Sequence, residues 1–269
     1  MDLKTTFSGS IPEYYDRCLG PAWFGPFAKD LAQRLGSRPP GDVLEIACGT
    51  GLVTRHLRKH LDPDLRLVAS DLSAAMLGYA RQQAADLEGI EWREADATRL
   101  PFEEGAFGAV VCQFGFMFVP DKKAAFREAR RVLKDGGTLL FSVWDRIEEN
   151  QHNLVIASVI ENLFPGDDEI RFRVPYEMYD VALLRELLAE GRFEEKRIEK
   201  KRISINSVSA RTLATGQVRG TPRALLLEKR GVSLDDVVDL VSAALAKAGG
   251  ADPYRGSAQA IIVEARAAD

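Results

Sequence analysis

Short apolar runs rich in β-branched residues recur through the first half of the chain, separated by stretches of helical period. Five runs predict strands: DVLEIA (42–47), LRLVASD (65–71), IEWREAD (90–96), GAVVCQFGF (108–116) and TLLFSVW (138–144). Strands that alternate with helices predict βαβ units with right-handed crossovers and a mostly parallel α/β sheet. In such a sheet, ligands bind at the carboxyl ends of the strands.

Two of the intervening helices have readable ends. Residues 73–87 place Ser73 as an N-cap before an apolar face of Met76, Ala80, Ala84 and Leu87. Residues 121–137 place Asp121 as a cap, and Gly136 is expected to end that helix.

The second half of the chain has a different pattern. Residues 153–191 read as mainly helical, and the charged run RFEEKRIEKKRISI (192–205) reads as a strand. Helix and turn then precede a last apolar strand, AQAIIVEARA (258–267). Lysines and arginines on an edge strand prevent edge-to-edge pairing, so we interpret the charged run as an exposed edge.

Composition narrows the class of protein. The chain has 269 residues with 46% apolar side chains and a formal charge of −4, typical of a globular enzyme without the basic surplus of a nucleic-acid-binding protein. No apolar run is long enough to suggest a membrane span, and three cysteines without paired spacing argue against a disulfide framework. We therefore expect a cytoplasmic enzyme with no membrane or nucleic-acid partner; oligomerisation stays open.

The stretch VLEIACGTG (43–51) places a tight glycine turn directly after the first strand. Such a turn lets backbone N–H groups approach a ligand. Thr54 stands where the dinucleotide-binding pattern has its third glycine. Alone the turn is weak evidence, but Glu45, Asp71 and Asp96 place an acid near the end of each of the first three strands.

Any one of these acids could simply cap a helix, but three at successive strand ends indicate a binding site. Carboxylates repel a pyrophosphate and attract an ammonium, so they favour a ligand with an adenosine part and a cationic part. A nicotinamide-dependent oxidoreductase is a weaker alternative, because the third glycine is missing and no hydride-transfer constellation is evident.

The motifs VLEIACGTG, ASDLSAAML, EADATRLPF, VVCQFGFMFVPD and EARRVLKDGGTLLFSVW resemble those of class I S-adenosylmethionine-dependent methyltransferases. The resemblance runs from Val43 to Trp144 and is greatest to ubiquinone and menaquinone biosynthesis methyltransferases. It implies a Rossmann-like, doubly wound seven-stranded sheet whose last strand, 258–267, inserts antiparallel between the fifth and sixth. It also implies S-adenosylmethionine as cofactor and a small-molecule acceptor.

By position, the resemblance implies a set of cofactor-binding residues. Glu45 would position the loop and the methionine amino group, and Asp71 would take the ribose hydroxyls. Ala47 and Gly49 would offer backbone contacts to the methionine moiety, and Leu72 and Met76 would pack against the adenine. Asp96 and Ala97 would contact the adenine edge, and Gln113 and Phe114 would flank the transferable methyl group. Tyr15, in a YD pair of the kind that lies near the cofactor in related enzymes, completes the set.

The acceptor and the catalytic base are less defined. His152 follows the fifth strand and is a candidate base, although a solvated loop histidine is the simpler interpretation. His56 and His60 share a helix face, but their basic neighbours argue against a metal site, and none is predicted. The aromatic residues Phe114, Phe116, Phe118 and Trp144 favour an apolar or aromatic acceptor; Arg171, Arg173 and Arg219 could instead bind a carboxylate.

We expect one methyltransferase domain over residues 1–269. Residues 1–36 would form amino-terminal lid helices, and the insertions 146–190 and 207–256 would form a cap over the methyl group. In-line transfer of that methyl would depend mainly on positioning. A protein that binds the cofactor without catalysis remains an alternative.

Overall fold

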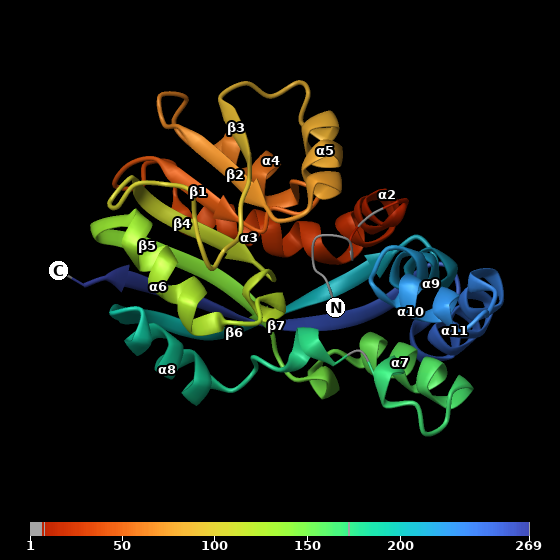
Figure 1. Ribbon diagram of the computed structural model, residues 1–269. Helices are drawn as coiled ribbons and strands as arrows, with labels where there is room; N and C mark the ends of the chain where they lie inside the picture. Colours follow the sequence, from red (N-terminus) through yellow and green to blue (C-terminus); the bar gives the residue numbers. More distant parts are fainter. Residues whose placement is uncertain (1–6, 8, 172, 269) are drawn as a thin grey trace.

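The computed structural model describes residue 7, residues 9–171 and residues 173–268. Its centre is a seven-stranded sheet with the order β3-β2-β1-β4-β5-β7-β6 (Figure 1). The strands are β1 (Val43–Ile46), β2 (Leu67–Asp71), β3 (Ile90–Glu94), β4 (Phe107–Gln113), β5 (Leu133–Trp144), β6 (Phe193–Ser207) and β7 (Tyr254–Ala267). The predicted α/β sheet is confirmed.

The last strand lies inside the sheet. β7 pairs antiparallel with both β5 and β6, whereas the pairs from β3 through β5 are parallel. Residues 258–263 of β7 are buried, which suits an interior position. β6 exposes a run of charged residues, Glu194–Arg197, alternates exposed with partly buried residues only further along, and closes the sheet as an edge. Both predicted strand positions are confirmed.

Helices cover both faces of the sheet. The main helices are α2 (Ile11–Tyr14), α3 (Gly25–Leu35), α4 (Leu52–His60), α5 (Ala74–Gln83), α6 (Lys122–Val132), α7 (Gln151–Leu163), α8 (Val181–Glu190), α9 (Ala210–Arg219), α10 (Arg223–Lys229) and α11 (Leu234–Gly249). Single turns of 3₁₀ helix are η2 (Phe116–Phe118), η3 (Ile147–Glu149), η4 (Asp168–Ile170) and η5 (Val174–Tyr176). Buried side chains of α3 and α4 pack on one face, and those of α6 and α8 belong to the larger core on the other.

Two predicted helix starts are confirmed by their caps. Ser73 Oγ accepts the Met76 N–H at 3.3 Å, and Asp121 Oδ1 accepts the Ala124 N–H at 2.9 Å. Each bond satisfies a backbone donor that the first helical turn leaves without a partner.

The predicted end of the second helix at Gly136 is wrong. α6 ends at Val132, and Leu133 already pairs with Phe107 in the sheet. Gly136 lies within β5 with φ of 73°, where a Cβ would meet the Arg266 guanidinium at 2.8 Å. The glycine therefore permits a close approach inside the sheet rather than a helix cap.

The amino-terminal helices are continuous. Between α2 and α3 runs a π-helix, η1 (Tyr15–Phe24), in which the Gly25 N–H bonds to the Gly20 carbonyl. π-helical turns are rare and occur often at functional sites. Here the wider turn accommodates Pro21, which lacks a backbone N–H.

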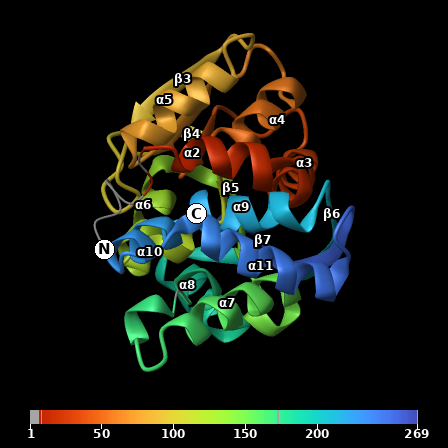
Figure 2. The same cartoon turned by 90° about the vertical axis from the view of Figure 1, so that its right-hand side faces the viewer.

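Four helices of the second half, α7, α9, α10 and α11, gather beyond the carboxyl edge of the parallel strands, whereas α8 packs against α6 and β6. Figure 2 looks onto that edge: α9, α10 and α11 cross it between the amino-terminal helices and α7. Across the part of the chain that the structure describes, no helix combines the length and apolarity needed to cross a membrane.

Candidate functional site

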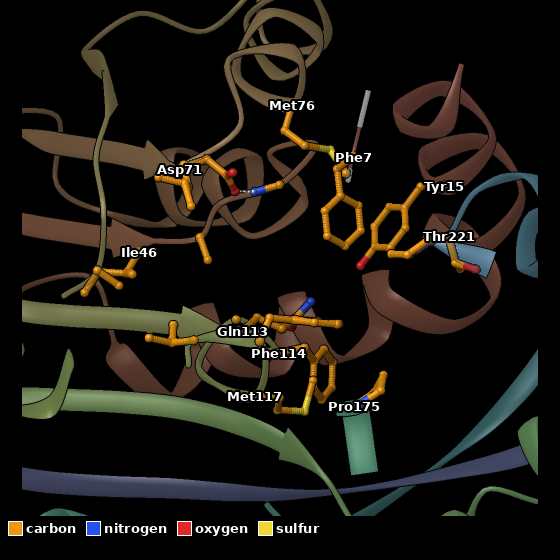
Figure 3. Close-up of a pocket in the computed structure, with 18 of the residues that line it drawn as sticks. Phe7, Tyr15, Ile46, Asp71, Met76, Gln113, Phe114, Met117, Pro175 and Thr221 are labelled. Atoms are coloured by element: carbon orange, nitrogen blue, oxygen red, sulfur yellow. Dashed lines mark hydrogen bonds between the residues drawn. The ribbon is translucent and has the colours of Figure 1, made fainter. Parts of the chain in front are cut away.

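A cavity of about 480 Å³ opens at the carboxyl ends of β1, β2 and β4. Three parts of the chain line it: the amino-terminal segment, the loops that follow the strands, and the second-half insertions. In Figure 3, Asp71 lies at one side of this space and Thr221 at the other, with Tyr15, Gln113 and Phe114 between them. The site is therefore shared between the sheet and the helices beyond it.

The loop after β1 brings its backbone to the cavity wall. Ala47, Gly49 and Gly51 have φ values of 55°, 55° and 77°, a left-handed conformation that glycine adopts without steric cost. Ala47 and Gly49 line the cavity, and a Cβ added at Gly49 would meet no atom within 4 Å. A side chain at Gly49 would thus extend into the space that a ligand would fill.

Asp71 ends β2 and connects two loops. Its Oδ2 accepts the Gly49 N–H at 2.8 Å, drawn as a dashed line in Figure 3, and its Oδ1 accepts the Ser73 N–H at 2.8 Å. Burial raises the pKa of Asp71, and these backbone bonds oppose that rise. Each oxygen has a second lone pair, so the carboxylate can accept further bonds from a ligand.

Asp96 follows β3 and lies at the exposed rim of the cavity. Its Oδ1 accepts the backbone N–H of Thr98 at 2.8 Å and the Thr98 hydroxyl at 2.7 Å. This local turn fixes the side chain. Ala97, also predicted, lines the cavity beside it.

Glu45 does not line the cavity. Only 1% of it is exposed, and its Oε2 accepts the Thr54 hydroxyl at 2.6 Å behind the loop. Burial raises the pKa of Glu45 to about 8. The expected row of three carboxylates therefore has two members at the cavity, and Thr54, in place of the third glycine, tethers the third acid under the loop.

Aromatic side chains form the wall at the end of β4. Phe114 has φ of 56° and stacks on Trp144 with ring centroids 3.7 Å apart and planes 10° apart. Both residues line the cavity with Met117. Gln113 donates Nε2–H to the Phe24 carbonyl at 3.3 Å, while its buried Oε1 has no partner among the described residues. That oxygen is an acceptor available to a ligand.

The amino-terminal segment contributes Tyr15. Its ring stacks on Phe24 at 4.5 Å, and its hydroxyl points into the cavity (Figure 3). Burial, with the nearby charges of Asp16 and Asp71, raises the pKa of the Tyr15 phenol, which keeps it protonated. The neighbouring Asp16 anchors the segment, because its Oδ1 accepts bonds from the Thr50 hydroxyl and from Arg55.

His152 lies elsewhere than its predicted place at the active site. It is 1% exposed, packs edge-on against Trp23 with centroids 4.5 Å apart, and has its Nε2 3.0 Å from Asn153 Nδ2. It does not line the cavity, although Asn153 does. Burial lowers the pKa of His152 to about 3, so the ring is neutral at ordinary pH. His152 is therefore neither a solvated loop histidine nor a base that faces the cavity.

The insertions bring two residues that the sequence analysis missed. Gln217 and Arg223 line the cavity and are 1% and 5% exposed, and Arg223 Nη1 donates to Gln217 Oε1 at 2.8 Å. The three arginines considered earlier do not line it; they pair with carboxylates: Arg171 with Asp168, Arg173 with Glu161 and Arg219 with Asp235. The apolar run that follows Arg223, ALLL, is the one sequence signal of its burial.

Ten of the eleven residues predicted to bind the cofactor lie together at the cavity, with Glu45 the exception. They are Tyr15, Ala47, Gly49, Asp71, Leu72, Met76, Asp96, Ala97, Gln113 and Phe114. Charge is unevenly distributed around them. The strand ends and the segments that follow them bring Asp71, Asp96 and Asp121, whereas Arg223 is the one basic side chain among the described lining residues.

A family model for the methyltransferase domain matches residues 44–141. The ubiquinone/menaquinone biosynthesis C-methyltransferase UbiE of Hahella chejuensis is 40% identical over 108 residues, which are 39% of this chain and 43% of that protein. The chain thus spans less than half the length of this curated relative. The segment matched by the family model supplies the strand-end half of the cavity.

Solved structures extend the likeness to the whole fold. Phosphoethanolamine N-methyltransferase 2 of Haemonchus contortus, solved with S-adenosylhomocysteine, has a TM-score of 0.61 at 17% identity over 98% of this chain and 58% of that one. The [4+2]-cyclase SpnF has a TM-score of 0.55 at 21% identity over 89% and 79%. Residues 44–141 therefore match a methyltransferase domain, and the chain as a whole shares its fold with these solved structures.

Proposed function

We propose that this protein binds S-adenosylmethionine in the strand-end half of the cavity and transfers its methyl group to a small molecule held in the insertion half. One observation carries the proposal: Asp71, Asp96 and the left-handed loop at Gly49 meet at one cavity, in the segment that matches the methyltransferase domain. The curated relative is, by its name, a C-methyltransferase of ubiquinone and menaquinone biosynthesis; the acceptor of this chain is proposed from the residues of its own cavity.

The residues present fit the cofactor. The Asp71 and Asp96 carboxylates can accept hydrogen bonds from ribose hydroxyls and an adenine amino group. Leu72 and Met76 offer apolar surface for the adenine ring, and the open space at Gly49 admits the methionine portion. The buried Gln113 Oε1 can accept from an ammonium. Glu45 would act indirectly, by holding the loop through Thr54.

When bound, S-adenosylmethionine supplies an electrophilic methyl group on a sulfonium. The chain's own residues then position and shield the acceptor. Phe114 and Trp144 wall the cavity with apolar surface, and Asp16 ties the segment that carries Tyr15 to the loop after β1. Holding two reactants in line can contribute about 7–11 kcal/mol to lowering a barrier.

The described lining contains no histidine. Tyr15 is held protonated by burial, and His152 lies behind the wall in its neutral form. We therefore propose an acceptor whose nucleophilic atom needs no strong base, such as an activated carbon, an amine or a thiolate.

The segments 1–36, 146–190 and 207–256 are proposed to act as a lid and a cap; within them, residues 1–6, 8 and 172 lie outside the described residues. Tyr15 and Phe24 from the first, Asn153 and Tyr176 from the second and Arg223 from the third line the cavity opposite the strand ends. This arrangement supports a covered reaction chamber, which would exclude water during transfer.

The alternatives make different predictions. A nicotinamide cofactor carries a pyrophosphate, which the acidic strand-end lining disfavours. The fold also supports a reaction named for cyclisation, as in SpnF, so fold alone does not establish methyl transfer. A protein that binds the cofactor without using it is the remaining alternative.

Isothermal titration with S-adenosylhomocysteine and with NAD, followed by an acceptor screen, tests the proposal. We expect S-adenosylhomocysteine to bind, NAD not to bind, and S-adenosylhomocysteine to be released from S-adenosylmethionine only when an acceptor is present. Binding of NAD instead would overturn the cofactor assignment. Tight cofactor binding with no release across a broad acceptor panel would favour a non-catalytic role.

A further inference from the structure

The insertion half of the cavity differs in charge from the strand-end half. It contains the buried guanidinium of Arg223 and the buried amide of Gln217, both from the segment between β6 and β7. Figure 3 shows Thr221 and Pro175 on this side, away from Asp71. A buried cation at the end remote from a cationic cofactor indicates a second recognition site.

We propose that this end is a carboxylate-binding site that selects the acceptor: an apolar or aromatic acid whose carboxylate bonds to Arg223 and Gln217. The proposal rests on the function proposed above, because it assigns the strand-end half to the cofactor. Arg223, which lines the cavity, takes the carboxylate-binding role that the sequence analysis considered for three other arginines: Arg171, Arg173 and Arg219.

Hydrogen-bonding groups carry the first part of the argument. Gln217 Oε1 accepts one Arg223 N–H at 2.8 Å, which fixes the amide so that its Nε2 is the donor left over. That Nε2 is buried and has no partner among the described residues. A guanidinium carries five N–H donors in a planar fork that matches a carboxylate. One carboxylate could therefore accept from both side chains.

The second part is charge. Arg223 interacts electrostatically with Arg173 and Glu161, and Arg173 is itself ion-paired with Glu161 at 2.5 Å. His152 adds no charge at this end because burial holds its pKa near 3. The Arg223 guanidinium lines the cavity and attracts an anionic group of a ligand.

The third part is the shape of the wall between the two ends. Phe114 and Trp144 form a stacked pair that lines the cavity with Met117 and Pro175. An aromatic or aliphatic body can pack against this surface while its carboxylate reaches Arg223. The acceptor would then span the cavity with its reactive atom toward the cofactor.

Isothermal titration of the S-adenosylhomocysteine-loaded protein with 2-naphthoate and with its neutral counterpart, 2-naphthamide, tests the proposal without needing turnover. We expect the carboxylate to bind about ten- to hundredfold more tightly, because charge-assisted bonds replace neutral ones. Equal affinities, tighter binding of the amide, or no binding of either probe would overturn the carboxylate site.

Variants then locate the site. Arg223→Gln should reduce the preference for naphthoate to less than about threefold. The matched control is Arg211→Gln, at an exposed arginine on α9 paired with Asp239. This variant should keep the wild-type preference for naphthoate. An unchanged preference in Arg223→Gln would refute the assignment to Arg223. Should Arg223→Gln not fold, Arg223→Lys keeps the charge but loses the fork, and wild-type selectivity in it would refute bidentate recognition.

The two proposals fail differently. Loss of S-adenosylhomocysteine binding in the wild-type protein would remove the proposed function. Normal S-adenosylhomocysteine binding with no discrimination between naphthoate and naphthamide would remove only the carboxylate site.

Discussion

Asp16 and Thr50, 34 residues apart in the chain, are joined by a hydrogen bond of 3.0 Å from the threonine hydroxyl to Asp16 Oδ1. The same oxygen accepts from Arg55 Nη2 at 2.9 Å. This contact fixes the π-helical segment η1 against the glycine loop after β1. Tyr15 is therefore positioned by its sequence neighbour.

The Asp16 contact should couple the amino-terminal segment to the ligand. Asp16→Asn is expected to speed amide exchange over residues 11–24 and to weaken S-adenosylhomocysteine binding by about three- to tenfold, through loss of a half-buried ion pair. Hydrogen exchange and titration measure the two effects. The matched control is Glu13→Gln, which breaks the exposed Glu13–Arg17 pair and should change neither. Equal behaviour of the two variants would contradict the coupling.

Asp71 provides the clearest test of the cofactor site. Asp71→Asn keeps the shape of the side chain but removes its charge, and we expect about ten- to hundredfold weaker S-adenosylhomocysteine binding, or about 1.5–3 kcal/mol. Calorimetry measures this directly. Asp86→Asn, at an exposed acid after α5, serves as the control. Wild-type affinity in Asp71→Asn would remove Asp71 from the site.

Two glycines with similar positive φ values allow a paired test of the loop. Gly49 and Gly105 have φ values of 55° and 63°, and a Cβ at either would meet no atom within 4 Å, but only Gly49 lines the cavity. Alanine at each should cost about 1 kcal/mol of stability. Only Gly49→Ala should also lose S-adenosylhomocysteine affinity, by at least about tenfold. A similar loss in Gly105→Ala would show that the effect is not steric.

The raised pKa of Glu45 predicts that the stability of the protein falls as pH rises from about 4.5 to about 8. The pKa of Glu45 is raised from 4.5 to about 8 by burial, so between these values the folded state holds a proton that the unfolded state has lost. The contribution of Glu45 to the free energy of unfolding is therefore fully present below pH 4.5 and falls as pH rises toward 8. Glu45→Gln, which stays neutral, should match the wild type near pH 5 and exceed it by about 2–4 kcal/mol near pH 8.

Urea denaturation of the ligand-free protein at the two pH values measures this difference. Glu88→Gln, at an exposed position, should show no such divergence from the wild type. If Glu45→Gln and the wild type keep a constant difference across this range, Glu45 is ionised in the folded protein.

Local patterns predicted most of the fold. The apolar runs gave strand positions, and Ser73 and Asp121 marked helix starts by chemistry that acts within one turn. Gly136 misled because a glycine near the end of a helical pattern looks like a cap, whereas its role depends on Arg266, a residue far along the chain. The sequence does not report such long-range approaches.

In the candidate site, too, local patterns predicted some residues and missed others. Asp71 and Asp96 were predictable because strand ends converge in a parallel sheet. Glu45 lies one residue before the end of β1, but its side chain accepts a hydrogen bond from Thr54 under the loop. Arg223 was missed because its place at the cavity depends on how α10 lies beyond the carboxyl ends of the strands, and no spacing rule relates Arg223 to those strands.

The placement of β7 between β5 and β6 has a consequence for the order in which the molecule is assembled on the ribosome. Residues up to Trp144 can complete five strands and the loops that carry Asp71 and Asp96, but β6 has no partner until β7 emerges. Gln217 and Arg223 lie between those two strands. A nascent chain can thus form the strand-end half of the cavity before the insertion half, which contains Gln217 and Arg223.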